Sequence, residues 1–339
     1  LKLAVIGITT PETHYATKPD NLKGYRVIAA EKALPALIEK VKKEGAGPVI
    51  VLSHMGLDED REMASRVGGI DLIVGGHSHT EVKTPVVVGS TIIVQAGYYG
   101  QKLGVMKVSV DTETKKMTRY SERRILQKVK AGPHDAYDAA VAGIIGKYDD
   151  QIRGEFGRVV GETRVDLAKR PFESNLGNLV CDAMREAAGA DAAIQNNGGI
   201  RTTIPKGKIT LEQAYMLLPF DNNLMTMELT GAQIIGLLEQ NAKTEGMLQV
   251  SGLKVVYDLT AAEGSRVKDL AIGGKPAERL RTYRVTTNDF LAAGGDRFDI
   301  FRAGKSAVIG DNVRDAFLDY LKKHSPVYPR TEGRIVVTR

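Results

Sequence analysis

Residues 71–80 read Asp71-Leu72-Ile73-Val74-Gly75-Gly76-His77-Ser78-His79-Thr80. The apolar run before the glycines is typical of a short buried strand. Because side chains alternate along an extended backbone, His77 and His79 can point to one side while Ser78 points away. The two glycines allow a sharp turn and a close approach of a ligand to the backbone. The stretch therefore predicts a strand that ends in a pair of imidazoles.

Strands and helices alternate around this stretch. We expect strands at 3–8, 49–52 and 70–74, and helices at 27–43 and 58–67. The unbroken apolar run at 3–8 indicates a strand buried on both faces, and Pro35 indicates a kink or a break in the first helix. This alternation favours a largely parallel sheet covered by helices, with sites at the carboxyl ends of the strands.

A third histidine belongs to the same pattern. His54 follows the strand at 49–52, so we expect it at the same sheet edge as His77 and His79. An isolated His-x-His sequence often belongs to a solvated loop, but three imidazoles at one edge favour a metal site. The remaining histidines, at positions 14, 134 and 324, are interpreted as surface residues.

The composition excludes several classes of protein. The chain has 339 residues, which is more than one hydrophobic core usually supports, so two domains are expected. No apolar run approaches the roughly 20 residues of a membrane helix. The net charge of +6 comes from scattered Lys and Arg, which argues against nucleic acid as a partner. Cys181 is the single cysteine, so we expect neither an internal disulfide nor a thiolate zinc site.

The later parts of the chain change in character. Strands at 91–95 and 103–110 are expected to continue the sheet, and 135–156 has a helical pattern whose apolar side chains we expect to make core contacts. Beyond Gly157, strands at 159–163 and 191–195 mix with helices at 176–188, 211–217, 230–240 and 314–323, with Thr230 as a candidate N-cap. This mixture indicates an α+β domain.

Two loops of that domain combine arginine with glycine or asparagine. Arg170 precedes the helix at 176–188, and Arg201 ends the sequence Asn196-Asn197-Gly198-Gly199-Ile200-Arg201. A guanidinium group binds phosphate or carboxylate through two parallel hydrogen bonds, and glycines let a ligand approach the backbone. The alternatives are an ordinary surface arginine and a simple Asn-Gly turn.

Two phenylalanines stand in loop-like surroundings. Phe220 lies in Leu218-Pro219-Phe220-Asp221-Asn222, and Phe290 lies shortly before Gly294-Gly295-Asp296. Paired aromatic rings can hold a flat ring between them, and stacking of one nucleic-acid base is worth roughly 1–3 kcal/mol. The pair therefore predicts a nucleoside site, although a phenylalanine near a turn also commonly fills a local core.

Together these motifs resemble the 5'-nucleotidase and UDP-sugar hydrolase family. The resemblance runs through nearly the whole chain, and it rests on Ser53-His54-Met55-Gly56, Gly75-Gly76-His77-Ser78-His79, Ser174-Asn175-Leu176-Gly177-Asn178, Gly198-Gly199-Ile200-Arg201, Leu218-Pro219-Phe220 and Gly294-Gly295-Asp296. It implies an α/β metallophosphoesterase domain of the αββα sandwich type, followed by an α+β nucleotide-binding domain. We expect a partial first domain at 1–130, a linking helix at 131–157 and the C-terminal domain at 158–339.

The resemblance also implies roles for individual residues. His54 and His77 are expected to hold one divalent metal ion and His79 a second, from the class of Zn, Mn, Co or Fe. Arg170 and Arg201 are expected to bind the phosphate or neighbouring oxygens, Asn196 and Asn222 the nucleoside, and Asp296 the ribose. Phe220 and Phe290 are expected to enclose the base. The family's location implies a periplasmic or extracellular protein, with no export signal visible in this chain.

The chain departs from the family pattern before the first strand. The family's Asp-x-His, Gly-Asp and Gly-Asn-His-Glu/Asp motifs, which supply further ligands and the catalytic histidine, have no match here. Asp166 also stands where some bacterial members have arginine, and Asn197 interrupts a glycine run. We therefore expect the C-terminal part of such an enzyme, which lacks a catalytic residue, is poorly active alone and pairs with the missing N-terminal part.

The expected reaction is hydrolysis of a 5'-nucleotide to nucleoside and phosphate by water activated between two metal ions. Alternatives in the same superfamily are a 2',3'-cyclic-nucleotide phosphodiesterase with 3'-nucleotidase activity, a UDP-sugar hydrolase and a sulfur-oxidation thiohydrolase. The aromatic pair argues against the last of these, because its substrate has no base. A non-catalytic nucleotide-binding module is the alternative of another class.

Overall fold

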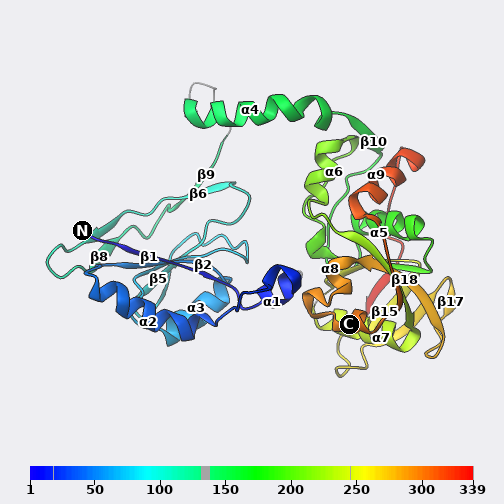
Figure 1. Cartoon of the computed structure of the whole chain (residues 1–339), viewed down its shortest axis with the longest axis horizontal. Coiled ribbons are helices and arrows are strands. Elements are labelled where there is room, and N and C mark those ends of the chain that lie inside the picture. The colour runs from blue at the N-terminus through cyan, green and yellow to red at the C-terminus, as the bar shows by residue number, and fades with distance from the viewer. Residues whose placement is uncertain (18, 131–137, 245, 339) are drawn as a thin grey trace. The chain divides into compact units, whose positions relative to one another are not determined.

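The computed structural model describes residues 1–17, 19–130, 138–244 and 246–338. The chain divides into two compact units, Leu1–Asp138 and Ala139–Arg339, which are coloured blue to cyan and green to red in Figure 1. Each unit has its own sheets and its own buried apolar side chains.

The first unit is built on a five-stranded sheet in the order β1-β2-β3-β5-β4. The strands β1 (Ala4–Thr9), β2 (Val49–His54), β3 (Leu72–Val74) and β5 (Thr91–Val94) are parallel, and β4 (Val86–Val88) is antiparallel to β5. Helices α2 (Ala30–Lys43) and α3 (Leu57–Arg66) lie on one side of this sheet, and a short helix α1 (Thr13–Ala16) follows β1 (Figure 1). The predicted parallel sheet with covering helices is confirmed.

The two faces of this sheet differ in burial. Leu34 and Met63 from the helices pack with Val51 and Ile73 on one face. On the other face Val5, Leu52 and Val74 are 60%, 49% and 39% exposed, and Leu52 and Val74 are direct neighbours in the sheet. The prediction that the strand at 3–8 is buried on both faces is wrong, because α2 and α3 pack on the same side.

The segment after β5 does not extend the sheet. Strands β6 (Lys102–Gly104) and β9 (Leu126–Lys128) form one antiparallel pair, and β7 (Val108–Val110) and β8 (Met117–Tyr120) form another. The prediction that 103–110 continues the sheet is therefore wrong. The β7–β8 hairpin closes a loop of only a few residues, which costs little entropy, and in sequence it lies between the two strands of the β6–β9 pair.

Helix α4 (Ala139–Phe156) opens the second unit. Its apolar side chains Val141, Ile144, Ile145, Tyr148 and Ile152 are all exposed, so the expected core contacts are wrong. Helical spacing identifies an apolar stripe, but it does not supply a partner for it. The ring of Phe156, at the end of α4, lies 4.9 Å from the ring of Tyr215. Residues 131–137 of the predicted linking segment lie outside the described residues.

The second unit contains a mixed sheet in the order β14-β11-β18-β13-β19. Its strands are β14 (Leu248–Ser251), β11 (Ala192–Asn196), β18 (Thr282–Asn288), β13 (Asn223–Thr230) and β19 (Lys305–Asn312). A second sheet contains β17 (Lys275–Pro276), β16 (Val267–Ile272), β15 (Leu253–Asp258) and β20 (Ile335–Thr338), and β10 (Val159–Thr163) pairs with β12 (Gly207–Thr210). The predicted α+β class is confirmed.

Helices cover both faces of the mixed sheet. They are α5 (Asn175–Ala188), α6 (Leu211–Leu217), α7 (Gly231–Lys243), α8 (Asp289–Ala292) and α9 (Val313–His324). Ala193 of β11 joins a core with Cys181 of α5 and Phe317 of α9, whereas Ile194 joins a core with Leu237 of α7. Burial raises the pKa of the Cys181 thiol, so the thiolate form is disfavoured.

Helix ends follow the sequence signals closely. Thr230 accepts a hydrogen bond from the Gln233 N–H, and the Gln233 side chain accepts one from the Thr230 N–H, which forms a capping box. The predicted N-cap is confirmed. Among the helices of the described residues, none combines the length and the apolar character that crossing a membrane requires.

Candidate functional site

His54 and His77 lie next to each other at the carboxyl edge of the first unit's sheet. His54 is the last residue of β2, and the two ring centroids are 5.0 Å apart at an interplanar angle of 62°. Gly76 permits this approach, since a Cβ at that position would lie 3.1 Å from His54 Nδ1. His77 has a φ of 73°, so the chain turns sharply directly after the glycine pair.

His79 has different neighbours. Its ring stacks on that of Tyr98 with centroids 5.0 Å apart, and Tyr99 lies 5.8 Å away. Glu12 is the carboxylate near His77, with Oε2 3.7 Å from Nε2. A catalytic zinc site usually has three protein ligands. Among the described residues no group of three or more His, Cys, Asp or Glu side chains could hold a metal ion, so these residues do not complete the site, and the three histidine roles remain predictions.

A buried carboxyl group lies behind these histidines. Asp60 of α3 accepts a 2.5 Å hydrogen bond from the Ser53 hydroxyl, one residue before His54. Its other oxygen, Oδ2, has no hydrogen-bond partner among the described residues and would lie 2.7 Å from a Cβ at Gly75. Burial raises the pKa of Asp60 to about 6, although the bond from Ser53 opposes the shift. Sequence patterns gave no sign of this group.

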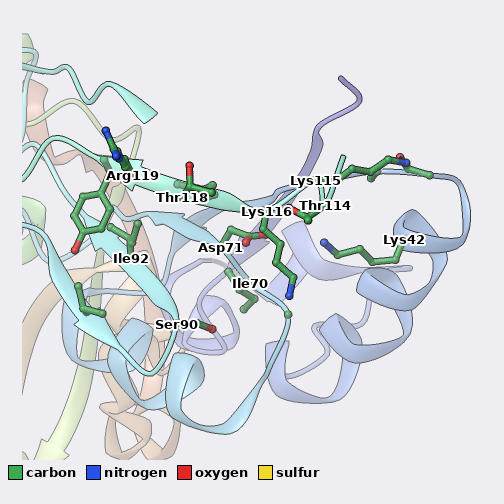
Figure 2. A pocket seen from close by; sticks show the side chains of 16 residues that line it. Lys42, Ile70, Asp71, Ser90, Ile92, Thr114, Lys115, Lys116, Thr118 and Arg119 are labelled. Carbon is green, nitrogen blue, oxygen red and sulfur yellow. The ribbon is translucent and has the colours of Figure 1, made fainter. Parts of the chain in front are cut away.

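A cavity of about 620 Å³ opens elsewhere in the first unit (Figure 2). Ile70 and Asp71 precede β3, Ser90 precedes β5, and the loop of the β7–β8 hairpin adds Lys115 and Lys116. These are the amino ends of parallel strands, whereas His54 and His77 follow the carboxyl ends. The cavity is therefore separate from the histidine pair.

In the second unit, one loop touches most of the predicted ligand-binding residues. It spans 196–201, begins with Asn196 at the end of β11 and includes a 3-10 turn at Asn197–Gly199. Asn196 Nδ2 donates a 2.7 Å hydrogen bond to Asp296 Oδ2. Asn197 Nδ2 donates to the carbonyl of Arg170 at 3.4 Å, and Arg201 Nη1 donates to the carbonyl of Gly198 at 3.2 Å. The structure thus brings Arg170, Asn196, Arg201 and Asp296 to one loop.

Buried amides fix the Asn196 end of this loop. Asn288 is fully buried at the end of β18, and its Nδ2 donates to Gln195 Oε1 at 2.9 Å and to Asn196 Oδ1 at 3.0 Å. Asp296 has a φ of 52°, which is unusual for a residue other than glycine. Strained backbone of this kind is concentrated at functional sites. The Asn196 amide and the Asp296 carboxylate are therefore held in one orientation.

The other end of the loop carries positive charge and an aromatic ring. The Arg201 guanidinium carbon lies 5.8 Å from the centroid of the Phe220 ring, and Phe220 is 47% exposed. Lys169 Nζ donates to the carbonyl of Ile200 at 3.0 Å. Desolvation, together with the neighbouring Arg201 charge, lowers the pKa of Lys169. Cations so close to one another suit an anionic ligand.

Phe220 and Phe290 come to the same end of the sheet by different routes. Leu224 of β13 pairs with Asn288 of β18, so the segments that carry the two rings adjoin this pair. The ring of Phe290 lies over Gly295, where a Cβ would come within 2.5 Å of it. No ring contact joins the two phenylalanines within the described part of the chain. The carbonyl of Asn222 accepts a hydrogen bond from the Val313 N–H.

Comparison with known proteins places this chain in a family. The model of the 5'-nucleotidase C-terminal domain matches residues 159–303. A snake venom 5'-nucleotidase of Naja atra is 31% identical, and the match covers 99% of this chain and 72% of that protein. The chain belongs to the 5'-nucleotidase family.

Two further relatives show how the family's proteins differ in extent. The trifunctional nucleotide phosphoesterase protein YfkN of Bacillus subtilis is 35% identical over 98% of this chain, which spans only 24% of that protein. The crystal structure of the 5'-nucleotidase precursor of Thermus thermophilus has a TM-score of 0.84 at 32% identity, covering 98% of this chain and 72% of the other. The chain thus spans much less than two thirds of the first of these relatives.

Within this 5'-nucleotidase family chain, the structure adds residues to the candidate site that sequence reasoning missed. They are Asn288, Lys169, Gln249, Arg314 and Asp60. Gln249 Nε2 donates to the carbonyls of Arg170 and Phe172 at 3.2 and 2.6 Å, which fixes the Arg170 loop. Asn288 ends β18 and caps α8, which carries Phe290, and an asparagine at such a helix start was a signal that could have identified it.

Proposed function

We propose that the second unit binds a nucleotide and that the complete protein hydrolyses its phosphomonoester, releasing nucleoside and phosphate. Arg170 and Arg201 bind the phosphate or neighbouring oxygens, Asp296 binds the ribose hydroxyls, and Asn196 and Asn222 contact the nucleoside. Phe220 and Phe290 enclose the base. Membership of the 5'-nucleotidase family supports this proposal, and so does the composition of the loop at 196–201.

The contacts of that loop are the observation that carries the proposal. A carboxylate held by a buried amide suits ribose hydroxyls, which donate hydrogen bonds to it. Guanidinium groups suit phosphate oxygens, to which they donate paired hydrogen bonds. Both kinds of group meet at the loop at 196–201, because its first residue, Asn196, donates to the Asp296 carboxylate and its last residue is Arg201. Polar groups at one end and cations at the other match the two ends of a nucleotide.

In the first unit, we propose that His54, His77 and His79 are metal ligands of the complete enzyme. The closeness of the His54 and His77 rings supports a shared ion from the expected class of Zn, Mn, Co or Fe, of which imidazole suits Zn and Fe best. The further ligands and the catalytic histidine are proposed to come from a preceding part of the protein. Because the described residues leave the site incomplete, we derive no reaction step through a metal.

Zinc binding tests the histidine roles directly. We expect His54→Ala to weaken Zn²⁺ binding at least about tenfold, as measured by calorimetric titration of the chain. Mutation of residues that only contact a metal ligand already lowers metal affinity by roughly 10–100-fold. His324→Ala is the matched control, because His324 pairs with Glu186 in the second unit. Equal zinc affinities of His54→Ala and the unmodified chain would contradict the proposal.

A substrate panel with added Zn²⁺, Mn²⁺, Co²⁺ or Fe²⁺ separates the enzyme alternatives. The panel contains a 5'-nucleotide, a 3'-nucleotide, a 2',3'-cyclic nucleotide and a UDP-sugar, and phosphate release is measured. A nucleotide-binding module without catalysis is the candidate of another class. Tight nucleotide binding without hydrolysis by the complete protein would support that module.

We also propose an extracellular or periplasmic location. The support is the similarity to a 5'-nucleotidase of snake venom, and the oxidising conditions of those compartments do not conflict with a single, fully buried cysteine. Fractionation of the native cells, with the protein followed by an antibody, tests the location.

A further inference from the structure

Arg314 is a buried arginine in the first turn of α9. It is 7% exposed, and its guanidinium carbon lies 3.8 Å from the centre of the Tyr215 ring. Nη1 donates to the carbonyl of Leu218 at 3.0 Å, and Nη2 donates to Asp221 Oδ1 at 2.9 Å. The two acceptors lie on either side of Phe220 in the sequence. The guanidinium therefore holds the loop at 218–221 at both ends of its aromatic residue.

The position of this charge is unfavourable for the helix that carries it. The N-terminus of a helix has a partial positive charge, so a cation in the first turn is destabilising there. Burial of a guanidinium group costs further free energy unless it is fully paired. Nε has no hydrogen-bond partner among the described residues. The hydrogen bonds to the Phe220 loop and the contact with the Tyr215 ring offset these costs.

A third contact connects α9 to the same loop. The Val313 N–H donates to the carbonyl of Asn222 at 2.9 Å. The first turn of α9 thus bonds to residues 218, 221 and 222, while the ring of Phe220 itself remains half exposed beside Arg201. The backbone of the loop is fixed and its aromatic ring stays accessible, as a stacking surface requires.

We propose that Arg314 is a positioning residue for base recognition, which acts by holding Phe220 ready to stack on the base of the nucleotide. This inference rests on the proposed function of the second unit. If the loop is already ordered before binding, less conformational entropy is lost when the nucleotide binds, and the affinity is higher. A simpler alternative is that Arg314 only stabilises the end of α6, whose last carbonyls include that of Leu218.

The test compares a ligand with a base and a ligand without one. Calorimetry on the full chain measures adenosine and ribose 5-phosphate. Arg314→Ala is expected to weaken adenosine binding about tenfold and to leave ribose 5-phosphate within about twofold. Arg314→Lys is expected to fall in between, since an ammonium group cannot bridge both acceptors and stack on Tyr215.

Asp221→Ala keeps the test decisive if Arg314→Ala does not fold. Asp221 is 84% exposed, so its removal spares the core, and we expect a loss of about two- to threefold for adenosine alone. Arg281→Ala is the matched control, because Arg281 also lies over a tyrosine and pairs with an acidic residue. It precedes the first residue of β18, whereas the proposed base site adjoins the last. It is expected to change neither affinity.

The outcomes distinguish the inference from the proposed function. The positioning role is overturned if the folded Arg314 and Asp221 variants bind adenosine within twofold of the unmodified chain. It is also overturned if the variants lose equal affinity for adenosine and ribose 5-phosphate. If the unmodified chain itself binds adenosine no more tightly than ribose 5-phosphate, the proposed base site fails instead. NMR order parameters of the Phe220 and Asp221 amides then still decide whether Arg314 orders the loop, since Arg314→Ala must lower them.

Discussion

Replacing Phe290 with alanine is expected to weaken adenosine binding about tenfold, the equivalent of about 1.4 kcal/mol of lost stacking. The ring lies over Gly295, next to the Asp296 carboxylate that we propose as the ribose ligand. Its removal takes away one face of the proposed base site and leaves Arg170 and Arg201, the proposed phosphate ligands, unchanged. Calorimetry with adenosine and ribose 5-phosphate measures the effect, which is expected for adenosine alone.

A second variant separates the position of the ring from its presence. Gly295→Ala places a methyl group where the ring of Phe290 now lies, at about 2.5 Å, so the ring must move. We expect adenosine affinity to fall although the aromatic residue is retained. Tyr328→Ala is the control, since Tyr328 is an exposed aromatic residue whose ring neighbours Arg330. Unchanged adenosine affinity in Phe290→Ala removes the stacking claim.

Asp60 is expected to make the first unit less stable as the pH rises. Its carboxyl group binds a proton more tightly in the folded chain, with a pKa of about 6, than at its ordinary value of 3.8. The stabilisation is therefore complete below about pH 3.8 and is lost as the pH rises through about 6. A shift of this size corresponds to at most about 3 kcal/mol.

Asp60→Asn is the variant that isolates this group. Asparagine keeps an oxygen that accepts from the Ser53 hydroxyl but cannot ionise, so its unfolding free energy is expected to lack the loss between about pH 4 and pH 6. Hydrogen exchange of the β2 and β3 amides in urea measures the first unit by itself. Asp58→Asn, an exposed change on the same helix, is the control. Parallel pH profiles of Asp60→Asn and the unmodified chain would rule the assignment out.

Sequence patterns predicted the fold well where the cause was local. The alternation of strands and helices and the Thr230 cap each follow from residues within one or two turns. The predictions failed where burial depends on a distant partner. Val5 belongs to an apolar run, yet it is exposed because both helices cover the other face, and the apolar stripe of α4 likewise remains exposed.

The candidate site follows the same division. Arg170 and Arg201 were identified from residue type and loop context, and Asn196 and Asp296 from the family resemblance. The structure brings all four to one loop. Arg314 and Asp60 were missed, because an arginine in an apparent helix start and an aspartate in a polar helix have no unusual pattern. Both are buried, and each bonds to a residue that sequence patterns do not connect with it. Arg314 bonds to Asp221, 93 residues away, and Asp60 bonds to Ser53, 7 residues away.

The stack formed by Phe156, Tyr215 and Arg314 has a practical consequence for spectroscopy. The chain contains no tryptophan, so Tyr215→Trp would place a single indole fluorophore between the end of α4 and the guanidinium that holds the Phe220 loop. With no second indole in the protein, its emission, excited selectively beyond the absorption of tyrosine, should respond when a ligand orders that loop. One substitution would thus allow binding to the second unit to be followed optically, on the millisecond scale and without a labelled nucleotide.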